Sequence, residues 1–379
     1  MIKTTHPSEI MKIAFLCTSE SWGGLEMNVV KLADNLSREG LSVTIFTVKD
    51  TKIHLNTDKN LVNCRLLPKH RKYFDLFKAR RFAKILNREG IRILLFMHSN
   101  DTEFASNTKL FYPDLKIIYH QNMHVGRKKK DFFHNIRFAR YDYWICPLNL
   151  LADEVKNLTN FPPDKVRIIP IGADSKRIEM AKSKIEYRKI LNINQEGFYF
   201  GIIGRIDKQK GQMDLLRAYN EIKDIDKDIK ILIMGEPTIG ESGEYFREIK
   251  EYIVNNHLSD FVFLRSYSKE VSNFYGAVDC FVLTSKSETY GMVTIEAMLS
   301  GVPVIAGSGG GTKELLEYGK YGSLYKSGVI SQLAVQMKDM LNNYDKKLKK
   351  AVLAQSYALH KYTDTIETQM FIDFFKSII

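Results

Sequence analysis

Cysteine is scarce in this chain, and long hydrophobic runs are absent. The 379-residue sequence has four cysteines, and none of them shows CxxC or Cys/His ligand spacing. Three lie in apolar runs that are typical of strands, so we expect reduced thiols in the core. No apolar stretch reaches about 18 residues, so no transmembrane span is predicted. The cysteines are Cys17, Cys64, Cys146 and Cys280.

The amino terminus also lacks the apolar segment of a secretory signal. Residues 1–10 are polar, and an apolar run begins only at Met11. We therefore predict a cytoplasmic protein, whose first ten residues are either a disordered extension or the product of an upstream start.

Basic residues outnumber acidic ones. The chain has 56 Lys and Arg against 44 Asp and Glu, a formal net charge of +12. Such an excess attracts phosphates, anionic lipid or nucleic acid, and charge alone does not choose among them. No recognised nucleic-acid-binding module accompanies the charge, so we predict no nucleic-acid partner.

The length favours two domains of roughly 150 to 200 residues. Short β-rich runs alternate with amphipathic helical patterns throughout, which is typical of open parallel sheets covered by helices. The predicted fold class is α/β, with two doubly wound, Rossmann-like domains. In the first we expect a helix at 25–38 and strands at 12–17, 42–48, 91–97, 116–120, 143–147 and 166–170.

A linker separates the two predicted domains. Residues 171–177 and the charged helix after them are followed by a new strand only at Phe198. We place the first domain at 11–177 and the second at 178–359, and we expect a final helix at about 360–379 to pack back on the first. Further strands of the second domain are expected at 230–234, 261–264, 280–284 and 302–306.

Two loops of the second domain carry candidate chemistry, because ligands of parallel sheets bind beyond the carboxyl ends of the strands. After Thr284 comes a loop with Glu288, then a helix with Glu296 in its first turns, ending at Gly301. Gly291 permits close backbone approach, and the helix start offers N–H groups to a phosphate. Solvated acids that favour a helix start would explain the two glutamates equally well.

The second loop follows the strand that begins at Phe198. Its sequence from Gly201 to Gly211 contains Arg205 and Lys210, which can grip a diphosphate as a fork and a point charge. A merely basic turn is the alternative interpretation.

These segments resemble the retaining GT-B glycosyltransferases of the large family 4 group. The resemblance rests on Gly204–Gly211, on the Glu-x7-Glu run from Glu288 to Glu296, and on Gly301–Glu314, in matching order and spacing. It covers the chain from Met11 to the closing helix. It implies a GT-B fold, in which two Rossmann-like domains face each other across a cleft.

The resemblance also implies site roles. Arg205 and Lys210 would neutralise the donor diphosphate as the nucleotide leaves. Glu296 would hold the ribose and Glu288 the hydroxyls of the transferred sugar. The phosphate would be bound by the backbone amides of Tyr290, Gly291 and Met292, with Thr294 nearby, and the second-rank contacts would be Gly309, Gly310 and Gly311.

In the first domain, Gly23 and Gly24 match the family's glycine-rich first loop. A tight turn that needs positive φ is the alternative explanation. His120 stands at the family's usual active-site histidine position, and His124 competes with it. A purely structural histidine is the other interpretation.

Two look-alike motifs are set aside. Gly307–Thr312 approximates a dinucleotide fingerprint, but it comes late in the chain and no acidic residue follows a further strand as expected. Asp224-Ile-Asp226 spells DxD within a charged connector, which indicates solvated surface. Because Arg205 and Lys210 supply the positive charge, we expect neither metal nor cofactor.

Two basic stretches with interleaved aromatic residues lie on the predicted acceptor side, at Arg71–Lys84 and Arg127–Arg140. Solvated helix faces explain them as well as contact with an anionic bilayer does. The second interpretation would place the enzyme peripherally at the inner face of the cell membrane, close to a lipid-linked acceptor.

The sequence thus predicts a retaining, metal-independent glycosyltransferase of cell-envelope polysaccharide or lipopolysaccharide biosynthesis. Its donor would be a nucleotide-diphosphate sugar, with UDP preferred over GDP, and its acceptor a glycan or a lipid-linked saccharide. A sugar-nucleotide epimerase or hydrolase and a non-catalytic GT-B binding module remain as alternatives.

Overall fold

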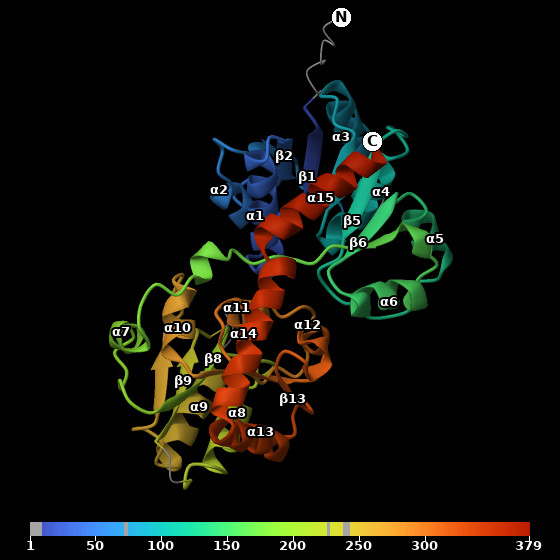
Figure 1. Cartoon of the computed structure of the whole chain (residues 1–379). Coiled ribbons are helices and arrows are strands. Elements are labelled where there is room, and N and C mark those ends of the chain that lie inside the picture. Colours follow the sequence, from blue (N-terminus) through green and yellow to red (C-terminus); the bar gives the residue numbers. More distant parts are fainter. Residues whose placement is uncertain (1–9, 72–74, 226–227, 238–242) are drawn as a thin grey trace, which may run out of the picture. The chain divides into compact units, whose positions relative to one another are not determined.

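The computed structural model describes residues 10–71, 75–225, 228–237 and 243–379. The chain forms two compact units (Figure 1). Unit 1 comprises the described residues up to Ile171 together with Asp364–Ile379, and unit 2 comprises Gly172–Thr363. The sequence predicts these divisions at 177/178 and 359/360, a few residues away from the observed ones. The expected extension over residues 1–9 lies outside the described residues.

Unit 1 is built on a seven-stranded parallel sheet with the order β3-β2-β1-β4-β5-β6-β7. Helices pack on both of its faces. The elements are β1 (Lys12–Leu16), α1 (Gly24–Arg38), β2 (Ser42–Thr47), α2 (Lys52–Asn56), β3 (Asn63–Leu66), α3 (Leu76–Arg88), β4 (Ile93–Phe96), α4 (Thr102–Thr108), β5 (Lys116–His120), α5 (Phe132–Phe138), β6 (Tyr143–Cys146), α6 (Asn149–Leu158), β7 (Val166–Ile168) and α15 (Asp364–Ile378).

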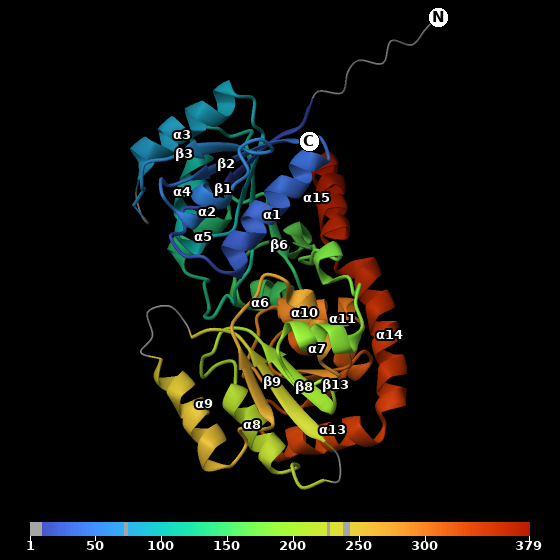
Figure 2. The same ribbon diagram turned by 90° about the vertical axis from the view of Figure 1, so that its left-hand side faces the viewer.

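Unit 2 repeats this plan with a six-stranded parallel sheet of order β10-β9-β8-β11-β12-β13. In Figure 2, α9 lies on one side of this sheet and α14 on the opposite side. The elements are α7 (Lys184–Ile190), β8 (Phe198–Ile203), α8 (Gln212–Asn220), β9 (Ile229–Met234), α9 (Glu244–Asn255), β10 (Val262–Arg265), α10 (Val271–Ala277), β11 (Cys280–Leu283), α11 (Met292–Leu299), β12 (Val304–Gly307), α12 (Thr312–Leu315), β13 (Ser323–Tyr325), α13 (Ile330–Asn342) and α14 (Tyr344–Lys361).

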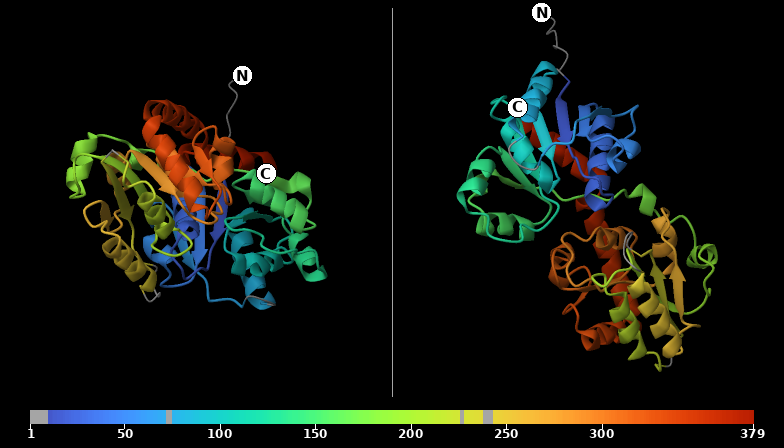
Figure 3. Two further views of the ribbon diagram at one scale, coloured as in Figure 1. Left: turned by 90° about the horizontal axis from the view of Figure 1, so that it is seen from below. Right: turned by 180° about the vertical axis from the view of Figure 1, so that it is seen from behind.

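Strand burial explains why both sheets are covered on both faces. The central strands β1, β4, β9 and β11 are apolar and buried at nearly every position, as expected for parallel strands between two helix layers. Figure 3 shows each unit from below and from behind, with helices on either side of its strands. The predicted buried thiols of Cys17, Cys146 and Cys280 are confirmed.

The last helix, α15, completes the core of unit 1. Its Phe371 and Phe375 are fully buried in the cluster formed by β1, β2, β4 and α1. An ion pair of 2.7 Å between Lys31 on α1 and Glu367 reinforces the contact. The helix expected from the sequence thus packs on α1, and Figure 2 shows the two helices side by side.

Candidate functional site

The strand order of each sheet reverses at one point, and this point locates the candidate sites. In open α/β sheets, ligands bind at the carboxyl edge where the order reverses. The reversal lies between β8 and β11 in unit 2 and between β1 and β4 in unit 1. In unit 2, the loop after β8 carries Arg205 and Lys210, and the loop after β11 carries Glu288.

The structure brings two of these predicted residues into direct contact. The Lys210 ammonium lies 2.6 Å from Glu288 Oε1, and the Ser285 hydroxyl donates to the same oxygen over 2.7 Å. The Thr284 hydroxyl donates to the Lys210 carbonyl, which ties the two loops together. Only 14% of the Glu288 side chain is exposed. Lys210 and Ser285 therefore supply the stabilisation that water would give to an exposed carboxylate. Arg205 lies apart from the pair, 65% exposed and 3.7 Å from Asp207.

The start of α11 presents polar groups that lack protein partners. Gly291 caps the helix with φ of 97°, a conformation that side chains rarely adopt. The hydroxyls of Thr294 and Thr312 are buried, flank Gly291 and find no hydrogen-bond partner among the described residues. Buried orphan hydroxyls beside a helix N-terminus are suited to bind an anion such as a phosphate.

Glu296 lies further along α11 and is half-buried. Its Oε2 accepts a hydrogen bond of 3.0 Å from the Tyr275 hydroxyl. Burial raises the pKa of this carboxyl above its ordinary value, although the Tyr275 bond and the charge of Arg177 oppose the rise. A carboxylate oriented in this way can accept hydrogen bonds from hydroxyl groups of a ligand.

Gly309, Gly310 and Gly311 pack against the backbone of the loop that carries Glu288. Gly310 pairs with Glu288 in a parallel bridge, and Gly311 N–H donates to the Glu288 carbonyl over 2.8 Å. A Cβ atom on Gly309 would overlap the Lys286 carbonyl, and one on Gly310 would overlap the Glu288 carbonyl. The segment Gly307–Thr312, which approximates a dinucleotide fingerprint, thus packs against the loop that carries Glu288.

In unit 1, the glycine loop after β1 has no strained turn. Gly23 is extended, with φ of −149°, and Gly24 is the first residue of α1. The alternative of a turn that needs positive φ is therefore wrong. Glu26 accepts the Gly23 N–H over 2.8 Å and a bond from the Ser19 hydroxyl, which fixes the entry into α1.

The structure encloses His120 completely. Its side chain is 0% exposed, its ring lies 5.5 Å from that of Phe371, and neither ring nitrogen bonds to a described residue. Burial, helped by the charge of Lys31, lowers the pKa of His120 to about 3, so the ring is neutral. His124 is one-third exposed, and its Nδ1 lies 2.6 Å from Glu154. A site role for either histidine stays a prediction.

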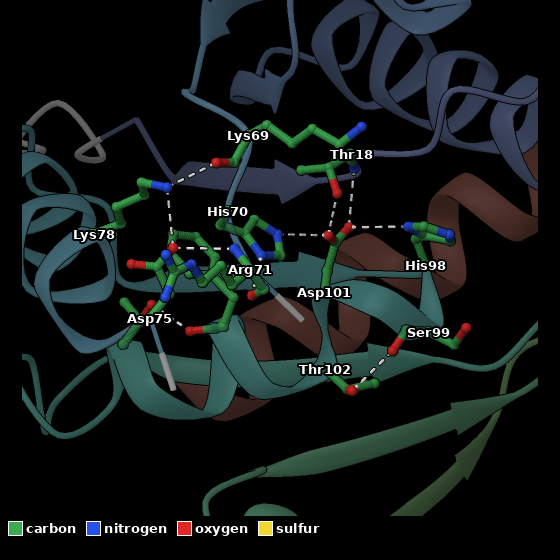
Figure 4. Close-up of polar contacts among 12 residues, drawn as sticks. Thr18, Lys69, His70, Arg71, Asp75, Lys78, His98, Ser99, Asp101 and Thr102 are labelled. Atoms are coloured by element: carbon green, nitrogen blue, oxygen red, sulfur yellow. Dashed lines mark hydrogen bonds and ion pairs between the residues drawn. The ribbon is translucent and has the colours of Figure 1, made fainter. Parts of the chain in front are cut away.

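A buried carboxylate that the sequence interpretation missed lies at the switch point of unit 1. Asp101 follows β4, is 0% exposed and accepts the Thr18 N–H over 3.0 Å and a bond from the Thr18 hydroxyl. His70 Nε2 lies 2.9 Å from Asp101 Oδ1, the oxygen that also accepts from the Thr18 hydroxyl, and His98 Nδ1 lies 3.7 Å from Asp101 Oδ2 (Figure 4). Burial opposes ionisation, but these imidazoles and the Thr18 hydroxyl outweigh it and lower the pKa of Asp101 to about 2.

The sequence holds a signal for only part of this cluster, namely the order of the strands that precede Thr18 and Asp101. Thr18 and Asp101 lie in the segments that follow β1 and β4, two neighbouring apolar strands whose carboxyl ends bring them together. His70, in contrast, reaches the cluster from the loop after β3, a strand that the sequence did not indicate. Burial opposes charging of His70, but the bond to Asp101, a bond to the Arg71 carbonyl and the nearby carboxylates raise its pKa.

The remaining expectations concern metals and membranes. The described residues contain no group of three or more His, Cys, Asp or Glu side chains that could hold a metal ion. They also include no helix long and apolar enough to cross a bilayer. Of the two basic stretches, 127–140 is fully described, whereas residues 72–74 of the other lie outside the described part. The same holds for Asp226 of the DxD sequence.

Comparison with known proteins identifies the family. Residues 183–355 match the family described as Glycosyl transferases group 1, and residues 22–177 match Glycosyltransferase Family 4. The alpha-monoglucosyldiacylglycerol synthase of Streptococcus pneumoniae is 25% identical, over 84% of this chain and 76% of its own. The lipopolysaccharide core biosynthesis mannosyltransferase LpsB of Rhizobium meliloti is 28% identical, over 40% of this chain and 43% of its own.

Solved structures agree on the fold. Crystal structures of Anabaena Alr3699/HepE in complex with UDP and with UDP-glucose have TM-scores of 0.84 and 0.78. Their identities are 20% and 19%, and each comparison covers 97% of this chain and 100% of that chain. Two Rossmann-like units of this kind define a GT-B protein. The chain belongs to the group 1, family 4 glycosyltransferases and is a glycosyltransferase.

Proposed function

We propose that the chain transfers a sugar from a nucleotide-diphosphate donor, with UDP preferred, to a glycan or lipid-linked acceptor with retention of anomeric configuration. The observation that carries the proposal is the cluster at the switch point of unit 2. It combines the Lys210–Glu288 pair with the orphan hydroxyls of Thr294 and Thr312 beside Gly291. The UDP and UDP-glucose complexes of Alr3699/HepE support the choice of donor.

In this proposal, different residues of unit 2 bind different parts of the donor. Lys210 and the exposed Arg205 neutralise the diphosphate, which stabilises charge that grows as the bond to the sugar breaks. The start of α11 and its two hydroxyls bind phosphate oxygens, and Glu296 accepts bonds from the ribose. Glu288, fixed by Ser285 and Lys210, holds the sugar hydroxyls.

The proposed transfer needs no protein nucleophile. The acceptor oxygen forms a bond to the anomeric carbon on the face from which the diphosphate departs. The nucleotide leaves with the bonding electron pair, and the acceptor proton passes to the departing phosphate oxygen. We propose that the positive charge for this step comes from Arg205 and Lys210.

A screen of nucleotide sugars tests this proposal directly. We expect UDP-sugars to raise the melting temperature of the protein, and Arg205→Ala and Glu296→Ala to weaken donor binding about tenfold or more. Thermal shift and product analysis are the measurements. Donor binding that is unchanged in both variants would defeat the site, and a converted or hydrolysed donor without any acceptor product would favour the epimerase or hydrolase alternative.

On the acceptor side, we propose that unit 1 contacts an anionic membrane surface. Phe77 on α3 and Phe132 and Phe133 on α5 are 87%, 70% and 68% exposed. Arg127 and Lys130 beside α5 are exposed as well. A groove of about 600 Å³ adjoins them, and its lining includes Leu76, Leu110, Phe133, Ile136 and Arg140. Exposed aromatic rings among basic side chains suit the boundary between headgroups and acyl chains.

Vesicle sedimentation checks this membrane contact. We expect the protein to sediment with anionic vesicles at low salt, and Phe132→Ser/Phe133→Ser to lower the bound fraction about tenfold because two rings no longer enter the bilayer. Val352→Ser/Leu353→Ser on α14 is the matched control, since those side chains are 57% and 64% exposed elsewhere. Equal recovery with neutral and anionic vesicles would contradict the proposal.

A further inference from the structure

Two cavities of unit 1 share α5 as a common wall. The first, which we call the polar cavity, has a volume of about 280 Å³ and reaches Tyr119 of β5 and Trp144 of β6. The second is the groove of about 600 Å³ next to the exposed rings of α5, which we call the apolar groove. His134 and Arg137 of α5, and Arg127 just before it, line both. One ligand molecule can therefore extend from one cavity into the other.

The polar cavity is rich in basic groups and has a fixed floor. Three Lys and Arg residues and two histidines line it, and no Asp or Glu belongs to the described residues of its lining. Gln121, which is fully buried, accepts the Trp144 indole N–H over 2.8 Å and donates to the Met123 carbonyl over 2.7 Å. A preformed cavity of this composition suits a small anionic group.

Two arginines at these cavities keep a charge that no described carboxylate neutralises. Arg137 is paired with Glu103 over 2.7 Å, so that carboxylate is already used. The Arg127 side chain makes no ion pair or hydrogen bond within the described part of the chain. Arg140, which lines the apolar groove, donates to the neutral Asn107 side chain over 2.8 Å. Arginine binds phosphate oxygens well because its donors form a planar fork.

The apolar groove gathers large hydrophobic side chains that face solvent. Leu76 at the start of α3, Leu110 after α4, and Phe133 and Ile136 on α5 are all exposed and all line it. A monomeric protein rarely brings exposed apolar side chains together without a ligand or partner for them. The groove volume lies within the range of about 300 to 1,000 Å³ that is usual for small-molecule sites. Its shape and lining suit an acyl chain.

We propose that unit 1 binds one lipid molecule with a phosphate-bearing head group, the head in the polar cavity beside Arg127 and the acyl chains in the apolar groove. The inference rests on the proposed function, whose lipid-linked acceptor it assigns to a chemical class, and every residue that it uses belongs to unit 1. It goes beyond contact with a membrane surface, because rings that enter a bilayer do not select a lipid molecule.

NMR of protein labelled with ¹⁵N-tryptophan tests this binding without donor or bilayer. The chain has two tryptophans, so Trp22, which is exposed and outside both linings, is an internal control for Trp144. We expect monomeric dihexanoyl phosphatidic acid to shift the Trp144 indole signal saturably and to leave that of Trp22 unchanged. Zwitterionic dihexanoyl phosphatidylcholine and chain-free glycerol 3-phosphate should each bind about tenfold more weakly. An unmoved Trp144 signal, or equal affinity for either comparison ligand, would overturn the inference.

Substitutions separate the head-group contact from the acyl contact. Arg127→Gln should weaken phosphatidic acid binding about tenfold or more. Lys128→Gln, which removes the same charge from an exposed neighbour outside both linings, should change it less than about twofold. Ile136→Ser should weaken binding of phosphatidic acid but not of glycerol 3-phosphate. Equal losses in Arg127→Gln and Lys128→Gln would show diffuse attraction and overturn the site. A failure of UDP-sugar binding would defeat the proposed donor and leave these lipid affinities unaffected.

Discussion

Lys210→Ala is expected to lower kcat/KM for sugar transfer about 10²- to 10³-fold, since the charge that stabilises the departing diphosphate is lost. The same change removes the cation 2.6 Å from Glu288, whose side chain is only 14% exposed. Only the Ser285 hydroxyl then still fixes the Glu288 carboxylate, whose charge is no longer compensated. The substitution therefore affects both the leaving group and the proposed sugar contact.

Two comparisons separate these effects. Lys208→Ala in the same loop is the matched control, because Lys208 is 65% exposed and pairs with Glu248 instead, so its kcat/KM should change less than about twofold. The charge reversal Lys210→Glu/Glu288→Lys keeps an ion pair between the two positions but places no cation at position 210. This double variant should fold yet stay inactive. Steady-state kinetics and thermal melting are the measurements. An active charge reversal would show that the pair is structural and that Lys210 does not grip the diphosphate.

Gly310→Ala is expected to abolish donor binding and to cost unit 2 about 2 kcal/mol or more of stability, because its new Cβ would have no room. The backbone of Gly310 has φ of 69°, and a Cβ there would overlap the carbonyl of Glu288. The loop that carries Glu288 would have to move, and this would break the Gly311 N–H bond to the same carbonyl. Denaturant unfolding and calorimetric titration with UDP measure the two losses.

Gly328→Ala distinguishes backbone strain from the clash. Gly328 has φ of 79°, and a Cβ there would meet no atom within 4 Å, so it should cost only about 1 kcal/mol and leave UDP affinity unchanged. If Gly310→Ala behaved like Gly328→Ala, the close packing of this glycine against the Glu288 loop would not be needed for binding.

The sequence predicted the parts of the fold that depend on local pattern. Apolar runs indicated the central strands, because parallel strands between two helix layers are apolar on both faces. The missed strands, β3 and β13, are short, and β3 has no fully buried residue. Their pairing comes from the neighbouring strands β2 and β12 rather than from their own hydrophobicity.

The candidate site was predictable where motif and topology coincide. Lys210 and Glu288 lie in the loops at one reversal point of the sheet, and the sequence placed both after the correct strands. The environment of His120 was not predictable, since the residue that covers its ring, Phe371, belongs to a helix at the far end of the sequence. Asp101 was missed because its partners come from three loops and no spaced motif joins them.

The place of α15 in the sequence has a consequence for synthesis on the ribosome. The sheet of unit 1 is complete once Ile168 has emerged, but the hydrophobic surface of α1 and β5 awaits Phe371 and Phe375, which are translated after all of unit 2. Until then, this apolar surface of the nascent first unit stays exposed. Unit 2 needs no segment from outside Gly172–Thr363, so the domain translated second can mature before the domain translated first.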